Sequence, residues 1–129
     1  MSAAGETEPR GVAYVPDLLF GSQVLSMVER AGLVGDLCGA ELEVRERAPG
    51  ASVLIVDLTA EAEHRAQIVA ELGAMEMLGG TRTLGFYSHV EADTRAMALE
   101  AGFDQVVPRS RMAREGVELI RALAEGEPG

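Results

Sequence analysis

The sequence predicts an α/β protein built around a parallel β-sheet. Short runs rich in β-branched residues alternate along the chain with longer segments of helical spacing, and this alternation is typical of consecutive βα units. Residues 53–56 are continuously apolar rather than alternating, as expected for a strand that helices cover on both faces. The chain has 129 residues, which is enough for one ordinary domain with a single core.

The N-terminal half is expected to contain a strand, a helix and a second strand. The run GVAYV predicts the first strand at residues 11–15. Ser22 is expected to cap a helix that ends at Arg30, with Val24 and Val28 on its inner face. Residues 33–38 are predicted to form the second strand.

Residues 39–48 allow two interpretations. The run ELEVRE alternates polar and apolar residues, which favours a strand. A strand there would leave only a few residues before the next one, whereas a parallel crossover needs about a dozen. We therefore predict a short helix at residues 40–48.

The C-terminal half repeats the alternation. Residues 51–57 form the most strongly predicted strand, and Ala62, Ala66 and Val69 give the helix after it an inner face. The run SHVE at residues 88–91 has the form of a capping box, and Ser110 is expected to cap the last helix. The predicted helices lie at residues 60–78, 88–102 and 111–124, and the predicted strands at 81–88 and 105–108.

Charge and composition exclude several functional classes. The formal net charge is −10, so nucleic acid and anionic membrane surfaces are not expected as partners. The single cysteine, Cys38, allows no disulfide within the chain and is expected to be a small buried side chain. The sequence has neither a secretion signal nor an apolar run long enough to span a membrane, so we expect a cytoplasmic protein.

Polar residues follow the predicted strands. They are Asp17 after the first strand, Asp57 and Thr59 after the third, Ser88 after the fourth and Arg109 after the fifth. In open parallel sheets, ligands bind at the carboxyl ends of the strands. The candidate site is therefore this edge of the sheet.

The constellation resembles the receiver domain of response regulators in two-component systems. The motifs that carry the resemblance are VLIVDL, GFYS and ALEAGFDQVVPRS, within a similarity over residues 11–124. The resemblance implies a flavodoxin-like doubly wound sheet of five strands in the order 2-1-3-4-5. It places Asp57 at the phosphoacceptor position and Ser88 and Arg109 at the phosphate-contacting positions. It also implies Mg²⁺ as a cofactor, with Asp17, Asp57 and Thr59 as the candidate ligands.

The sequence also departs from the family's pattern. Pro16 stands where the family has its first acidic residue, which leaves Asp17 alone and should weaken Mg²⁺ binding. Arg109 replaces the family's lysine, and the two side chains are not interchangeable. Val106 stands at the position of the family's switch aromatic and has no ring.

These features leave alternatives open. Asp57 is either a phosphoacceptor or a polar residue that is hydrogen-bonded at a strand end, and Arg109 is either paired with Asp57 or Asp17 or exposed to solvent. A conventional phosphorylated receiver and a flavodoxin-like small-molecule binding domain are the alternative functions. No nucleophile–base pair can be named, so an enzyme is not expected, and His64 and His89 lack metal-ligand spacing.

The hypothesis that fits these observations best is a stand-alone, atypical receiver domain, or pseudo-receiver. We expect a tail at residues 1–10, the receiver-like domain at 11–124 and a second tail at 125–129. Signal transduction is expected to proceed through protein–protein contacts, with a histidine kinase or a downstream effector as partner and without efficient phosphorylation. The chain is expected to be a monomer or a homodimer.

Overall fold

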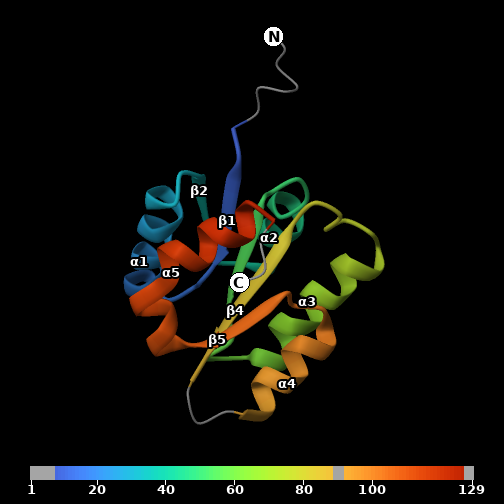
Figure 1. Ribbon diagram of the computed structural model, residues 1–129. Helices are drawn as coiled ribbons and strands as arrows, with labels where there is room; N and C mark the ends of the chain where they lie inside the picture. The colour runs from blue at the N-terminus through green and yellow to red at the C-terminus, as the bar shows by residue number, and fades with distance from the viewer. Residues whose placement is uncertain (1–7, 89–91, 127–129) are drawn as a thin grey trace.

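The computed structural model describes residues 8–88 and 92–126, and within them five strands alternate with five helices (Figure 1). The strands are β1 (Arg10–Tyr14), β2 (Val34–Cys38), β3 (Val53–Asp57), β4 (Arg82–Tyr87) and β5 (Gln105–Pro108). The helices are α1 (Leu18–Arg30), α2 (Glu41–Arg47), α3 (Ala62–Ala74), α4 (Ala92–Ala101) and α5 (Arg109–Ala124).

The strands form one parallel sheet in the order β2-β1-β3-β4-β5, which confirms the predicted fold. β3 lies in the middle, with Val56 opposite Tyr14 of β1 and Asp57 opposite Phe86 of β4. The carboxyl ends of β1, β3 and β4 therefore meet at one edge of the sheet, which is the edge that the sequence predicted for the site.

Helices cover both faces of the sheet. α1 and α5 lie together on one face, and α2, α3 and α4 lie on the other (Figure 1). Successive residues of β3 point to opposite faces: Leu54 and Val56 belong to the core under α2–α4, and Val53 and Ile55 to the core under α1 and α5. Burial on both sides explains why residues 53–56 are continuously apolar.

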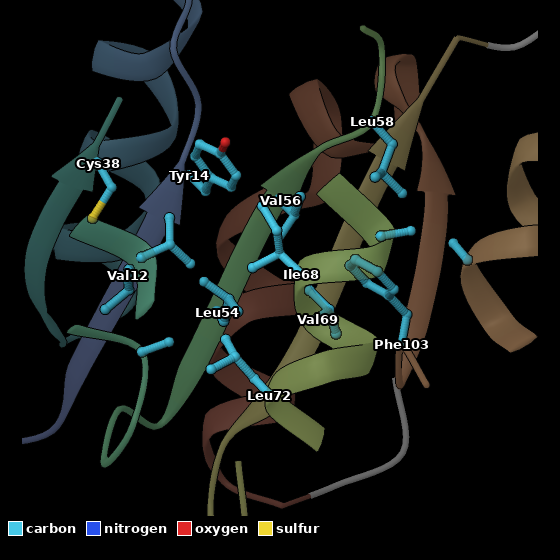
Figure 2. Close-up of a cluster of buried hydrophobic side chains, with 14 of the residues drawn as sticks. Val12, Tyr14, Cys38, Leu54, Val56, Leu58, Ile68, Val69, Leu72 and Phe103 are labelled. Atoms are coloured by element: carbon cyan, nitrogen blue, oxygen red, sulfur yellow. The ribbon is translucent and has the colours of Figure 1, made fainter. Parts of the chain in front are cut away.

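The core under α2–α4 extends across the whole width of the sheet. Figure 2 shows it from Cys38 on β2, past Leu54 and Val56 on β3, to Phe103 beside β5. Cys38 is fully buried, and this burial raises the pKa of its thiol to about 11, so the thiol stays protonated at neutral pH. Cys38 is a packing residue, as predicted. Tyr14 lies at the margin of the same core.

The start of α1 differs from the prediction. The helix begins at Leu18, one turn earlier than expected, because Asp17 is its N-cap and accepts a hydrogen bond from the backbone N–H of Phe20 at 2.9 Å. Ser22 lies inside the helix, where its hydroxyl donates to the carbonyl of Leu18. The predicted Ser22 cap is therefore wrong.

The start of α5 also differs. Pro108 occupies the N-cap position without a side-chain hydrogen bond, and the helix begins at Arg109. Ser110 is a residue of the first turn, so the prediction that it caps the helix is wrong. Pro108 itself is extended, with ψ at 150°, and the next residue, Arg109, is already helical.

The ambiguous region after β2 is resolved as predicted, with α2 rather than a strand. The predicted capping box at residues 88–91 lies partly outside the described residues, which include Ser88 but not Glu91. Most of the predicted N-terminal tail also lies outside them. No helix of residues 8–88 and 92–126 is long and apolar enough to cross a membrane.

Candidate functional site

The centre of the candidate site is the carboxylate of Asp57, the last residue of β3. Its position follows from the sheet, because four apolar residues before it fill the two cores and leave it at the edge. Asp57 is only 5% exposed, so the carboxylate is not a solvent-facing residue of a loop. A buried charge of this kind requires partners.

Thr59 provides two of these partners. The Oδ1 atom of Asp57 accepts hydrogen bonds from the backbone N–H of Thr59 at 2.8 Å and from its hydroxyl at 2.5 Å. The contact from a side chain to the backbone two residues later fixes the turn that leaves β3. One oxygen of the carboxylate is thereby used for local structure.

Arg65 faces the other oxygen. Its Nη1 atom donates to the backbone carbonyl of Asp57 at 2.9 Å and lies 3.8 Å from Oδ2 of the same residue. The side chains are 8% and 7% exposed for Arg65 and Asp57, so both charges are removed from water together. The arrangement is a buried ion pair strengthened by a charge-assisted hydrogen bond.

The pair was not predicted from the sequence, although one signal could have revealed it. Arg65 lies on the inner stripe of α3, at helical spacing from Ile68, Val69 and Leu72, all of which are buried. An arginine on an apolar helical face requires a carboxylate nearby. Asp57 is the residue at the adjacent strand end that meets this requirement.

Tyr14 holds the guanidinium from another side. The central carbon of the Arg65 guanidinium lies 5.4 Å from the centre of the Tyr14 ring, within the range of a cation–π contact. Burial raises the pKa of the Tyr14 hydroxyl, and the charge of Arg65 opposes this effect only in part. The Tyr14 hydroxyl therefore stays protonated at physiological pH, and the face of the neutral ring can contact the guanidinium of Arg65.

The loop between β3 and α3 contains a strained residue. Glu61 has a φ of 50°, in the left-handed region that non-glycine residues rarely adopt. Its carbonyl accepts the backbone N–H of Arg65 at 3.0 Å, and its carboxylate lies 3.9 Å from Nη2 of Arg65. The loop conformation is thus tied to the same arginine that faces Asp57.

Arg109 does not join the site. Its guanidinium carbon lies 4.3 Å from the centre of the Phe20 ring, and the side chain is exposed. Between the two sequence-based alternatives for Arg109, the structure shows exposure, with a cation–π contact added. The cation beside Asp57 is Arg65.

Two of the candidate magnesium ligands, Asp17 and Asp57, have other partners in this arrangement. Asp17 is an exposed N-cap whose Oδ1 accepts the Phe20 N–H. The oxygens of Asp57 face the donors of Thr59 and the guanidinium of Arg65. Within the described ranges, no three His, Cys, Asp or Glu side chains converge. The donors and the guanidinium at the Asp57 oxygens are unfavourable for a second cation at the same place.

The remaining predicted positions lie around this centre. Ser88 follows β4 at the same edge and is half-buried, while His89 lies outside the described residues. Val106 is 5% exposed and packs in the core under α2–α4, opposite Gly85 of β4. Valine has no aromatic ring that could move between a buried and an exposed position.

A hollow of about 440 Å³ lies over the loop between β3 and α3. Its lining includes Thr59, Glu61, Glu63 and His64. The carboxylates of Glu61 and Glu63 are unfavourable for a phosphate or another anion, and Arg65 lies beneath the surface rather than in the lining. The hollow therefore offers no support for a nucleotide or flavin site.

Comparisons with known proteins identify the fold. No protein-family model matches the chain, and no curated protein matches it. Among solved structures, a Francisella response regulator receiver domain superposes with a TM-score of 0.77 at 12% identity, over 92% of this chain and 98% of the other. The receiver domain of the putative response regulator NarL from Mycobacterium tuberculosis has a TM-score of 0.73 at 22% identity, over 93% and 98%.

A third similar structure has a different description. A putative pilus assembly-related protein from Burkholderia pseudomallei has a TM-score of 0.75 at 13% identity, over 95% of this chain and 93% of the other. At these identities the comparisons establish the fold. The chain has the fold of a response-regulator receiver domain over nearly its whole length.

Proposed function

We propose that this chain is an atypical receiver domain that transduces signals in the cytoplasm through protein–protein contacts, without efficient phosphorylation of Asp57. The observation that carries the proposal is the enclosure of the Asp57 carboxylate by Thr59 and Arg65. The receiver fold supports the signalling context, and the altered site supports the loss of phosphorylation.

The physical argument concerns access and charge. Phosphoryl transfer onto a carboxylate needs a free oxygen in line with the leaving group and cations that neutralise the phosphoryl oxygens. Here Oδ1 accepts two hydrogen bonds and Oδ2 faces a guanidinium that the chain itself supplies. Arg65 is covalently part of α3 and cannot dissociate as a metal ion does. The positive charge of Arg65 thus stabilises the unmodified, ionised carboxylate of Asp57 rather than a phosphorylated product.

Two further side chains that could act as nucleophiles, Cys38 and His64, are engaged elsewhere. Cys38 is buried, with a pKa raised to about 11, and His64 lies on the surface with Nε2 at 3.0 Å from a carboxylate oxygen of Glu41. A protein partner, a histidine kinase or a downstream effector, fits a chain with a net charge of −10 better than nucleic acid or an anionic membrane does.

The proposal is tested by an amide NMR titration with Mg²⁺ and then with beryllofluoride, a mimic of the phosphoryl group. We expect the amide signals of Asp57, Thr59 and Ser88 to stay unchanged at millimolar Mg²⁺ and after beryllofluoride is added. A conventional receiver domain titrated in parallel provides the positive control. Saturable shifts that cluster around Asp57 and Ser88 would contradict the proposal and support the conventional phosphorylated receiver.

A further inference from the structure

The surface between α3 and α4 contains a furrow that the Asp57 site does not use. Its middle part is a hollow of about 450 Å³, and the residues that line it come from the facing stripes of the two helices: Glu63, Ala66, Gln67, Met97, Glu100 and Ala101. The alanines and the methionine are buried or half-buried, whereas the two glutamates and the glutamine are exposed. The furrow therefore has an apolar floor between carboxylates from both helices.

The furrow extends along most of the length of both helices. Glu63 also lines the hollow over the loop between β3 and α3, together with Thr94 of α4. Ala101 also lines a hollow of about 280 Å³ at the opposite end, together with Gly73 of α3 and Leu78. The three hollows are thus consecutive sections of one channel. From Glu63 to Gly73 this channel spans nearly three turns of helix, or about 15 Å.

Small side chains on the facing helices keep the furrow open. α3 and α4 lie side by side in Figure 1, and α4 packs on the core through Ala98, which is fully buried. Ala66, Gly73 and Ala101 present only a methyl group or no side chain to the furrow, and a Cβ atom on Gly73 would meet no other atom within 4 Å. The space between the outer faces of the two helices is therefore available to another molecule.

The furrow is acidic. The described residues that line its three hollows include the carboxylates of Glu61, Glu63, Glu100 and Asp104 but only one arginine, Arg82, at the far end. Glu100 lies in the last turn of α4, where the helix dipole disfavours a negative charge and where no basic residue offsets it. Among the described residues, the ion pairs of α3 use other side chains than Glu63. Cations of a partner would relieve this excess of negative charge.

Methionines add apolar surface that can adapt to a partner. Met97 is half-buried in the middle of the furrow, and Met75 and Met77, which follow α3, are 55% and 39% exposed. Met77 precedes Leu78, which lines the far hollow, and its backbone N–H donates to the carbonyl of Leu72 at 2.9 Å. Unbranched methionine side chains adjust to different apolar shapes and are frequent at protein-binding surfaces.

We propose that the furrow between α3 and α4 is the docking site for a basic amphipathic helix of a partner protein. This inference rests on the proposed function in that the output of the domain is contact with another protein. The apolar face of the partner helix would cover Ala66, Met97 and Ala101, and its arginines or lysines would meet Glu63 on α3 and Glu100 on α4.

A basic helix fits the furrow better than other occupants do. The walls are two helices whose backbone groups are hydrogen-bonded internally, so they offer side chains only. An extended peptide would bury unpaired N–H and C=O groups there, whereas a helix satisfies its own. A second copy of the chain in two-fold symmetry would place the carboxylates of one furrow against those of the other, and like charges oppose this arrangement.

The test uses the full chain and a designed helical peptide of about 14 residues, stapled to maintain its helix, with leucines on one face and arginines on both flanks. We expect it to shift the amide NMR signals of Gln67, Met97 and Ala101. The variant Gln67→Arg places a cation in the furrow and should bind the peptide about tenfold more weakly. Glu63→Gln/Glu100→Gln should bind it several-fold more weakly, and binding to the unmodified chain should fall as salt rises.

Matched controls distinguish the furrow from the net charge of the chain. Gln23→Arg adds the same cation at an exposed position of α1, and Glu46→Gln/Glu118→Gln removes two exposed carboxylates from α2 and α5. Neither variant should change binding by more than about twofold, because exposed charges at a distance are screened by salt. A peptide with glutamates in place of the arginines should bind at least about tenfold more weakly. All the substituted residues are exposed, so the amide spectra should show that each variant keeps its fold.

Three outcomes would overturn this inference: no shifts in the furrow at low salt, equal binding of the glutamate peptide, or sedimentation showing a dimer that Glu63→Gln/Glu100→Gln dissociates. The last outcome would assign the furrow to a basic surface of a second copy. The beryllofluoride titration of the Glu63→Gln/Glu100→Gln variant reports on Asp57 independently, so a failure of the furrow inference is distinguishable from a failure of the proposed function.

Discussion

At the residue scale, the function of the site depends on what surrounds one carboxylate. Asp57 is buried at the edge of the sheet, with donors from Thr59 on one oxygen and the guanidinium of Arg65 facing the other. A charge in such a place is stable only while both partners remain. The contributions of Arg65 and Thr59 can be measured separately.

The first prediction concerns Arg65. Arg65→Met removes the cation and leaves the Asp57 carboxylate buried without a counter-charge, so the free energy of unfolding should fall by about 3–5 kcal/mol. Arg109→Met serves as the control, because Arg109 is exposed and its loss should cost within about 1 kcal/mol. Urea unfolding of both variants measures the difference. Equal stability of the two variants would show that Arg65 does not hold the site.

The second prediction concerns the hydroxyl of Thr59. Thr59→Val keeps the shape of the side chain but removes its hydrogen bond to Asp57, which should lower the free energy of unfolding by about 1.5 kcal/mol. Thr59→Ser keeps the hydroxyl and should lose clearly less. The same denaturation measurement compares them, and a serine variant that is no more stable than the valine variant would contradict the assigned role.

The sequence located the carboxylate but not its partner. Asp57 follows from a local pattern, an apolar strand that ends in an acid, and the structure places it at the predicted edge. Arg65 lies eight residues later on a helix, and its contact with Asp57 depends on how α3 packs over β3. Arg109 was a candidate because it directly follows a strand, yet its guanidinium lies over the ring of Phe20 on α1. Such pairings are set by tertiary packing.

At the scale of the elements, the ends of the helices decide where side chains of the site point. α1 begins at Leu18 because Asp17 caps it, and this start places Leu18 and Leu19 on the surface. The sequence pattern predicts only Ser22 as the cap, because a serine within a helix resembles a serine at its start, whereas the structure has Asp17 there. The structure distinguishes them by the hydrogen bond of each side chain.

The third prediction tests this cap. Asp17→Ala removes the acceptor for the Phe20 N–H and should lower the free energy of unfolding by about 1 kcal/mol. Ser22→Ala removes only a bond from the hydroxyl back to the helix carbonyl and should change stability by less than about 0.5 kcal/mol. Thermal or urea denaturation compares the two, and a larger effect at Ser22 would contradict the assigned start of α1.

The fourth prediction concerns the approach of α1 to β1. A Cβ atom on Gly21 would lie 2.9 Å from the backbone oxygen of Val15, which cannot move aside as a side chain can. Gly21→Ala should therefore lower the free energy of unfolding by about 1–2 kcal/mol despite its better helix propensity. A Cβ atom on Gly73 of α3 would meet no neighbouring atom within 4 Å, so Gly73→Ala should instead raise stability by about 0.5–1 kcal/mol. Urea unfolding compares the two variants, and stabilisation by both substitutions would contradict the close approach.

At the scale of the whole molecule, the parallel sheet could be predicted because the βα alternation is repeated along the chain. Five βα units require a parallel sheet, and the receiver resemblance supplied the order that the structure has. The short crossover before β3 decided the helical assignment of α2 against its local alternation. Chain-length constraints are therefore readable from the sequence, whereas contacts between separate elements are not.

The start of α1 illustrates that limit. Leu18 and Leu19 follow a predicted strand, where large apolar side chains are more often buried. In the structure they are 82% and 75% exposed, because α1 begins at Leu18 and presents both of them to solvent.

The fifth prediction addresses the central claim directly: that Arg65 and Thr59 keep Asp57 from accepting a phosphoryl group. The measurement is the intact mass of the full chain after incubation with acetyl phosphate and Mg²⁺, beside a conventional receiver domain treated identically. The mass of this chain should stay unchanged while that of the control rises by one phosphoryl group. A gain of one phosphoryl group that the Asp57→Asn variant lacks would contradict the claim.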